Sequence, residues 1–315
     1  MKIFIDRLYP KKHIIVERME PYWNQWGHSS TWDLNEADIQ LCFGHRQFKT
    51  KLPVVQRLDG IHYKGSGKNS VISKLYSNAN AVIYQSKFCK LAAEKFLKPR
   101  NPNPNDCIIY NGIEPISDTI LNRQEKRKNI NIFATSVWRR WKRLREITKT
   151  FLTALDKTDL PIFLHILGDV KGFKKPKNSN IIFYGNLEYS EIMNYYTVGD
   201  VFIHISKNDW CPNSVVESLG FGMPILASTA GGGTVEMLNL GDNLGLLIEE
   251  GFADLSKDPY SDEWNKMTPE QLEDGANKLL DLCRRKEKII LPKELHIENT
   301  ARQYINTFSY VLGEI

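Results

Sequence analysis

The chain has 315 residues and a formal net charge of +5, with 42% hydrophobic and 25% charged side chains. This length is too great for one ordinary hydrophobic core and predicts two domains of globular composition. No apolar run approaches the ~18 residues that cross a bilayer, and the N-terminus has no apolar signal region, so we expect a cytoplasmic protein.

The first third of the chain alternates short apolar runs with polar segments. Strands are predicted at Lys2–Leu8, Ala37–Phe43, Pro53–Leu58, Ala81–Tyr84 and Ile108–Tyr110. A helix is predicted over Ser86–Leu97, with Ser86 as its N-cap and an apolar face made of Phe88, Leu91, Ala92 and Phe96. These elements predict a Rossmann-like domain over residues 1–114, which is short for a complete domain of this kind.

A polar, charged stretch, Gly112–Lys128, follows an Asn-Gly turn and is predicted to be the linker. Beyond it, helical spacings alternate with strands predicted at Asn131–Thr135, Phe163–Leu167, Asn180–Tyr184, Val201–Ile205, Pro224–Ala227 and Leu244–Ile248. A capping sequence at Thr268 predicts a helix ending near Cys283. The fold class is therefore α/β, with a second Rossmann-like domain over residues 115–297 and a last helix, in residues 298–315, that packs back on the first domain.

Several ligand motifs are incomplete or missing. Gly65–Ser70 resembles a phosphate-binding loop, but His62 stands where the first glycine is required and Asn69 where serine or threonine is required, so we predict a surface turn. No Gly-x-Gly-x-x-Gly follows the first strand, which argues against a dinucleotide. There is no Asp-x-Asp, and the seven histidines show no metal-ligand spacing. We therefore expect neither a bound metal nor another cofactor.

The most informative stretch is Asp209–Glu236. A strand ends in a loop that carries Asp209, the next helix carries Glu217, and a further strand runs into three glycines. Loops at the carboxyl ends of parallel strands are where open α/β sheets bind ligands. Glycines let backbone amides approach phosphate oxygens near a helix start, and the Glu217 carboxylate can accept hydrogen bonds from sugar hydroxyls.

The spacing Asp209-x7-Glu217, within DWCPNSVVESLGFGMPI and followed by Gly-Gly-x-x-Glu236, resembles the signature of the GT-B glycosyltransferases of family 4 (glycosyl transferases group 1). The usual family pattern is Glu-x7-Glu, and this chain is similar to a branch with Asp followed by Cys-Pro-Asn. The resemblance implies two Rossmann-like domains facing a cleft. It also implies transfer of a sugar from a nucleoside-diphosphate sugar to a hydroxyl of a glycan, lipid-linked or other acceptor, with retention and without metal. The family's Gly-rich first loop is absent, and Asn24–Ser30 is the only candidate replacement.

The resemblance also implies roles for single residues. Arg139 and Lys142, in the basic run SVWRRWKRL, clamp the departing diphosphate, and Asp59 lines the reacting face. Glu217 holds the ribose hydroxyls, and Asp209 holds sugar hydroxyls. The other donor-binding residues are Gly168, Tyr184, Gly185, Asn186, Leu187, Asn213, Ser214, Gly231, Gly232 and Gly233.

Other interpretations stay open. Glu217 could be only a helix-cap partner, Asp209 a solvated loop acid and Asp59 a turn residue. The basic run could be a solvated helix face or a nucleic-acid patch, and the clusters Arg123–Lys128 and Lys171–Lys177 could be solvated loops or weak contacts with a membrane surface. Two other function classes remain, a DNA-base-modifying sugar transferase and a non-catalytic binding protein on a decayed glycosyltransferase scaffold. The mild charge makes nucleic acid the less favoured partner.

Overall fold

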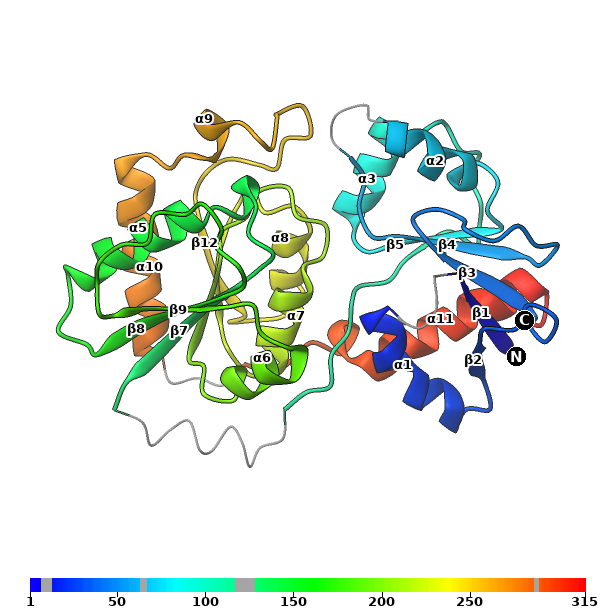
Figure 1. Cartoon of the computed structure of the whole chain (residues 1–315), viewed down its shortest axis with the longest axis horizontal. Helices are drawn as coiled ribbons and strands as arrows, with labels where there is room; N and C mark the ends of the chain where they lie inside the picture. Colours follow the sequence, from blue (N-terminus) through cyan, green and yellow to red (C-terminus); the bar gives the residue numbers. More distant parts are fainter. Residues whose placement is uncertain (7–12, 63–66, 117–127, 286–288) are drawn as a thin grey trace. The chain divides into compact units, whose positions relative to one another are not determined.

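A computed structural model gives the fold and describes residues 1–6, 13–62, 67–116, 128–285 and 289–315 (Figure 1). The contacts divide the chain into unit 1, which is Met1–Glu114 with Lys293–Ile315, and unit 2, which is Pro115–Pro292. In the described residues, each unit contains a six-stranded sheet whose strand pairs are parallel. The predicted α/β class with two Rossmann-like domains is confirmed.

Unit 1 has the strand order β2-β1-β3-β4-β5-β6. Its helices α1 and α11 lie on one face of the sheet, and α2 and α3 lie on the other (Figure 1). The strands are β1 (Lys2–Asp6), β2 (Ser29–Thr31), β3 (Ile39–Phe43), β4 (Val54–Leu58), β5 (Ala81–Tyr84) and β6 (Cys107–Ile108). The helices are α1 (Ile14–Gln25), α2 (Gly67–Tyr76), α3 (Lys87–Phe96) and α11 (Ile297–Leu312).

The last helix completes the core of unit 1. Trp23 of α1 is fully buried against Tyr304 and Phe308 of α11, and its indole N–H donates to the Ala301 carbonyl at 3.2 Å. The return to unit 1 begins before the predicted residue 298. The short 3-10 helix Lys293–Leu295 already belongs to this unit, because the backbone of Ile113 bonds to Leu295 and Ile297 on either side of His296.

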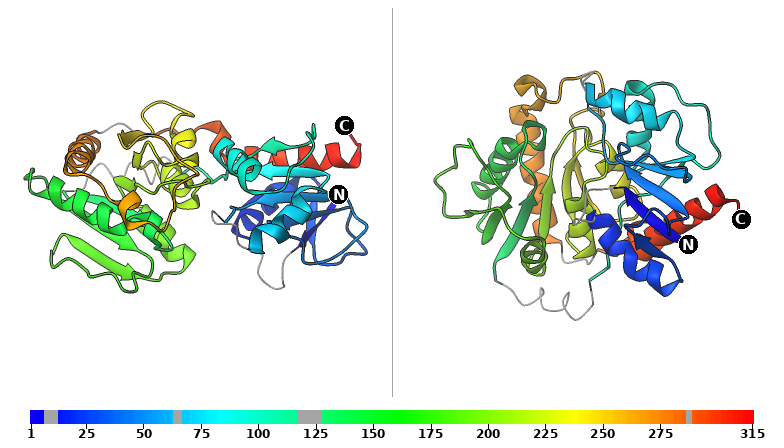
Figure 2. Two further views of the ribbon diagram at one scale, coloured as in Figure 1. Left: turned by 90° about the horizontal axis from the view of Figure 1, so that it is seen from above. Right: turned by 45° about the vertical axis from the view of Figure 1, so that its right-hand side comes forward.

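Unit 2 has the strand order β12-β11-β10-β7-β8-β9. Helices α5 and α10 lie side by side on one face, and α6, α7 and α8 lie on the other (Figures 1 and 2). The strands are β7 (Ile130–Thr135), β8 (Ile162–Leu167), β9 (Ile181–Gly185), β10 (Val201–His204), β11 (Ile225–Ser228) and β12 (Gly245–Ile248). The helices are the 3-10 turn η1 (Arg140–Lys142), α5 (Leu144–Leu155), α6 (Tyr189–Tyr196), α7 (Asn213–Gly220), α8 (Gly233–Leu238), α9 (Asp262–Asn265) and α10 (Pro269–Arg284).

The strand order of unit 2 reverses between β7 and β10. From β7 the chain continues outward through β8 and β9, and it then returns to β10 on the other side of β7 and continues to β12. In open parallel sheets, ligands bind beyond the carboxyl ends of the strands at such a reversal. The loops after β7 and β10 are the ones that carry Lys142 and Asp209.

Some predicted segments differ in the structure. The predicted surface turn Gly65–Ser70 is partly wrong, since residues 63–66 lie outside the described residues and α2 already begins at Gly67. The Asn69 side chain accepts from the His62 amide at 3.0 Å and donates to the His62 carbonyl at 2.6 Å. Most of the predicted linker, residues 117–127, also lies outside the described residues.

The candidate replacement for the Gly-rich loop, Asn24–Ser30, lies at the amino edge of the unit 1 sheet. It joins the end of α1 to β2, and the Ser29 amide donates to the Met1 carbonyl at 3.2 Å. It therefore cannot replace a loop that follows β1 at the carboxyl edge. Within the described residues, no helix is long and apolar enough to cross a membrane.

Candidate functional site

A buried ion pair joins the loops after β7 and β10 of unit 2. The Lys142 ammonium, at the end of η1, pairs with Oδ2 of Asp209. His204, the last residue of β10, places Nε2 2.9 Å from the same oxygen, and Asp209 Oδ1 accepts from the Trp210 amide at 3.0 Å. Asp209 is only 8% exposed, so it is not the solvated acid at a loop mouth that one interpretation of the sequence suggested.

The charges of this group follow from its partners. Burial alone would raise the pKa of Asp209, but the Lys142 charge and the hydrogen bond from His204 outweigh burial and hold that pKa below its usual value. Burial lowers the pKa of His204, which the bond to Asp209 offsets only in part. At neutral pH, Asp209 is therefore a carboxylate, and a neutral His204 donates its Nε2 hydrogen to it.

The structure brings the predicted glycine loop to Asp209. The Asp209 amide donates to the Gly231 carbonyl at 3.2 Å, and the Gly233 amide donates to the Asp209 carbonyl at 2.7 Å. Gly232 has φ of +64° and ψ of −121°, a conformation that requires glycine. The Gly231 amide also has an internal acceptor, the Ser228 carbonyl at 2.9 Å. The Gly231 and Gly233 amides therefore bond within the protein, and of the three glycine amides only that of Gly232 has no protein acceptor among the described residues.

The first turns of α7 lie at the same edge of the sheet. Glu217 is 7% exposed and lies on the buried side of α7. The side-chain oxygen of Asn213, at the first position of the helix, is buried and has no hydrogen-bond partner within the described residues. A buried acceptor without a partner costs about 1–3 kcal/mol, so the Asn213 oxygen is suited to a ligand hydroxyl or N–H. Ser214 follows it and is half-buried.

The two cations predicted to clamp a diphosphate have different partners among the described residues. The Arg139 guanidinium lies over the Trp141 ring, 5.3 Å from its centroid, and forms no ion pair within the described residues. It lines an open pocket of about 890 Å³ with Lys171 and Asp262, whereas Lys142 pairs with Asp209. The joint clamp of Arg139 and Lys142 on a diphosphate therefore stays a prediction.

Three further predicted residues hold neighbouring loops together. Gly168 has φ of +105°, its amide donates to the Gly185 carbonyl at 2.8 Å, and a side chain there would lie 2.1 Å from the Ser136 carbonyl oxygen. The Asn186 side chain accepts from the Asp169 amide at 3.2 Å. Gly168, Gly185 and Asn186 therefore join the loops that follow β7, β8 and β9, and half-buried Leu187 continues the last of them.

The hydroxyl of Tyr184 bonds within the protein. It lies 2.8 Å from Nδ1 of His165, whose Nε2 lies 3.1 Å from the side-chain oxygen of Asn131. The Tyr184 ring also contacts Tyr195 of α6, with centroids 4.5 Å apart. Burial lowers the pKa of His165 to about 4, so this imidazole is neutral at physiological pH. The structure thus places Tyr184 in an aromatic and polar cluster under α6.

Asp59 of unit 1 lies in a polar cluster of its own. Its carboxylate pairs with Nη1 of buried Arg57 at 2.7 Å, accepts from the side-chain amide Nε2 of Gln85 at 2.7 Å and lies 3.4 Å from Nε2 of His13. Burial alone would raise the pKa of Asp59, but Arg57 and His13 together lower it. The sequence analysis did not single out His13, which is the N-cap of α1, or Gln85, which lies between the end of β5 and the N-cap Ser86 of α3.

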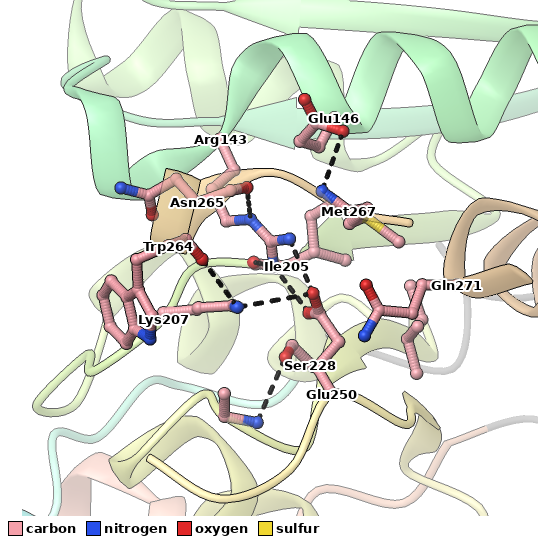
Figure 3. A network of polar contacts seen from close by, with 12 residues as sticks. Arg143, Glu146, Ile205, Lys207, Ser228, Glu250, Trp264, Asn265, Met267 and Gln271 are labelled. Carbon is pink, nitrogen blue, oxygen red and sulfur yellow. Dashed lines mark hydrogen bonds and ion pairs between the residues drawn. The ribbon is translucent and has the colours of Figure 1, made fainter. Parts of the chain in front are cut away.

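A second buried network in unit 2 was also not predicted. Arg143 and Lys207, from the loops that carry Lys142 and Asp209, meet at the Glu250 carboxylate (Figure 3). The side chain of Arg143 and that of Glu250 are both 0% exposed. Arg143 stands next to Lys142 in a basic run, and nothing in the neighbouring sequence indicates that its side chain is buried.

Residues 128–258 match the family model of glycosyl transferases group 1, and this segment contains Lys142, Asp209 and Glu217. Among solved structures, the GtfA/B complex shares the fold with a TM-score of 0.62 at 12% identity, over 84% of this chain and 54% of that chain. The pneumococcal O-GlcNAc transferase GtfA, solved with UDP and GlcNAc, has a TM-score of 0.58 at 13% identity, over 83% and 53%. This chain therefore spans about half the length of these two proteins.

Anabaena HepE, solved with UDP-glucose, is similar over nearly all of both chains, 98% and 99%, with a TM-score of 0.59 at 14% identity. No curated protein matches the sequence. The fold is that of the GT-B class of glycosyltransferases. Within that class, residues 128–258 are similar to the family of glycosyl transferases group 1.

Proposed function

We propose that the chain transfers a sugar from a nucleoside-diphosphate sugar to a hydroxyl of a glycan or another acceptor, with retention of configuration and without a metal. One observation carries the proposal. Lys142, Asp209 and the Gly231–Gly233 loop meet at the strand-order reversal of unit 2, where open α/β sheets bind ligands. The matched family segment spans this same group of residues.

The proposed chemistry follows from the charges. The bond between the anomeric carbon and the diphosphate oxygen breaks, and negative charge accumulates on the diphosphate as it leaves. An ammonium group carries three N–H donors, so Lys142 can keep Asp209 and still donate to the diphosphate. The acceptor hydroxyl attacks the same face of the sugar, and the leaving phosphate takes its proton.

Other residues in this proposal hold the donor in place. Asp209 and the Gly232 amide face sugar hydroxyls or phosphate oxygens, and the Asn213 oxygen accepts from the donor. Glu217 holds the ribose, and Asp59 of unit 1 lines the reacting face. For the role of stabilising the diphosphate, Lys142 is favoured over Arg139, because the guanidinium of Arg139 lies over the Trp141 ring.

A donor panel tests the proposal. The purified protein is screened by thermal shift against uridine, guanosine and adenosine diphosphates and their hexose conjugates. A ligand at 100 times its Kd adds about 2.7 kcal/mol of stability, which is easily detected. Donors that bind are then tested for release of the nucleoside diphosphate, and the anomeric configuration of the product is read by NMR. If no donor binds and no donor releases its nucleoside diphosphate, the non-catalytic scaffold is favoured. A product of inverted configuration would refute retention.

The role of Lys142 is tested with a double variant, because loss of Lys142 alone also leaves the Asp209 carboxylate buried without its cation. Lys142→Met combined with Asp209→Asn removes both charges and keeps the volumes similar. We expect this folded double variant to lose diphosphate stabilisation and to turn over at least about 10²-fold more slowly, the loss typical of removing one transition-state donor. Wild-type turnover in the double variant would refute both assignments.

A further inference from the structure

The buried network of Arg143, Lys207 and Glu250 contains two basic side chains and one carboxylate. Arg143 and Lys207 come from the loops after β7 and β10, and both point at the Glu250 carboxylate beyond β12 (Figure 3). Burial alone would raise the pKa of Glu250, but Arg143 chiefly, with Ser228 and Lys207, lowers it. The Glu250 carboxylate is therefore ionised at neutral pH.

Arg143 immediately follows Lys142 and has a left-handed backbone, with φ of 57° and ψ of 40°. This residue ends η1 and begins α5, so its backbone sets the direction in which Lys142 leaves the turn. Its guanidinium donates to Glu250 through two nitrogens at 2.6 and 2.7 Å, to the Ile205 carbonyl at 2.9 Å and to the Asn265 carbonyl at 2.8 Å. A planar guanidinium bound in this bidentate way has little freedom to rotate.

Lys207 lies two residues before Asp209. Its ammonium lies 3.6 Å from Glu250, donates to the Trp264 carbonyl at 2.9 Å and lies 5.2 Å from the centroid of the Trp264 ring. Its backbone amide donates to the Trp141 carbonyl at 3.3 Å, which links the two loops directly. One carboxylate thus holds the chain neighbours of both Lys142 and Asp209.

We infer that Arg143, Lys207 and Glu250 are positioning residues that fix Lys142 against Asp209 in the geometry that the reaction uses. The inference rests on the proposed function. Replacing a buried ionic group by apolar side chains of similar volume is often neutral or stabilising, so stability alone does not require these three charges. Their geometric effect is on the two loops that carry Lys142 and Asp209. Arg143 is the residue after Lys142, and Lys207 lies two residues before Asp209, so both loops are held by the same carboxylate.

The test separates stability from positioning. Glu250→Gln leaves two buried cations without a carboxylate and is expected to lower the urea midpoint. The triple variant Arg143→Met, Lys207→Met, Glu250→Gln removes every charge, and methionine meets the same left-handed backbone restriction as arginine. We expect the triple variant to regain part of the midpoint, since the charges are gone but the Ile205, Asn265 and Trp264 carbonyls lose their donors. Its kcat for release of UDP from UDP-glucose, or from whichever panel donor the wild type cleaves fastest, is expected to stay about 10²-fold low, with KM within about threefold.

A matched control comes from unit 1, where Arg100 and Asp106 form a bidentate pair at 2.8 Å with side chains 6% and 12% exposed. Arg100→Met with Asp106→Asn is expected to change the midpoint and to leave kcat unchanged. A triple variant with wild-type kcat would overturn the inference.

A second measurement does not depend on turnover. In protein with ¹³C-methylated lysines, the Lys142 signal is assigned by its loss in Lys142→Arg and compared between wild type and triple variant. We expect it to move toward the position of an unpaired lysine in the triple variant, and an unchanged signal would also overturn the inference. A wild type without turnover whose Lys142 signal still moves in the triple variant would refute the proposed function alone.

Discussion

Removing the Lys142 charge gives a sharp test of the electrostatics at the site. The side chains of Lys142 and Asp209 are 16% and 10% exposed, so Lys142→Met leaves a largely buried carboxylate with His204 as its remaining side-chain partner. Breaking a buried pair in this way costs about 3–5 kcal/mol, and the bond from His204 places the expected loss at the lower end, about 3 kcal/mol at pH 7.5.

The sign of the pH dependence follows from the two folded states. In the wild type, the pKa of Asp209 is lowered, so its stabilisation is present above the unfolded value of about pH 4 and is lost below it. In Lys142→Met, burial dominates and raises that pKa, so protonation relieves the penalty as the pH falls. The stability difference between the two proteins should therefore shrink between pH 7.5 and pH 4.5.

Urea unfolding followed by circular dichroism at several pH values measures this difference. Titrating groups away from this pair are common to both proteins and cancel in the comparison. Burial and the Lys142 charge both lower the pKa of His204, so loss of that charge lets His204 protonate more readily and shrinks the difference in the same direction as the pH falls. Adding Asp209→Asn to Lys142→Met should remove most of the loss at pH 7.5. A stability difference that is the same at pH 7.5 and 4.5 would show that Asp209 is not the buried carboxylate of the described pair.

Other predictions concern the loops and unit 1. Gly168→Ala should cost about 3 kcal/mol in urea unfolding, because it combines φ of +105° with a contact of 2.1 Å to the Ser136 carbonyl oxygen. Gly185→Ala, with φ of +76° and open space around it, should cost only about 1 kcal/mol, and equal losses would contradict the close contact. Since the pKa of His165 is lowered to about 4, the unfolding free energy should fall by up to about 1.4 kcal/mol per pH unit between pH 6.5 and 4, and His165→Gln should flatten that slope. Asp59→Asn should cost about 2 kcal/mol by leaving Arg57 without its carboxylate, and under the proposed function it should also slow donor release; an unfolding curve like that of the wild type would contradict the Asp59 pairing.

Much of the fold could be predicted because its signals are local. The buried parallel strands are short runs of Ile, Val and Leu, and the caps at Ser86 and Thr268 act as expected, with both side chains accepting amides of the first helical turn. Helix α1 was not predicted, since it contains Pro21, a residue that usually interrupts a helix interior. On α3, the prediction that Leu91 belongs to the packed apolar face is wrong, since Leu91 is 58% exposed; the packing partner of a helix is not encoded within the helix itself.

The candidate site was predictable to the extent that it follows strand ends. Asp209 and Gly232 come after neighbouring parallel strands, so their meeting follows from topology. Spacing in the sequence does not show whether Arg139 or Lys142 pairs with Asp209. That pairing depends on the 3-10 turn and on the left-handed backbone of Arg143. The pairing of Arg143 with Glu250 spans 107 positions, and nothing local distinguishes that arginine from its exposed neighbours.

The way unit 1 is divided along the chain affects its folding during synthesis. Its core needs Tyr304 and Phe308 against Trp23, yet unit 2 is translated in full between these residues. At about 5–20 residues per second, the N-terminal sheet waits on the order of 10–40 s with the surface that receives α11 uncovered. A nascent chain that stops before Lys293 would present this indole-lined surface to chaperones, whereas unit 2 would already be complete.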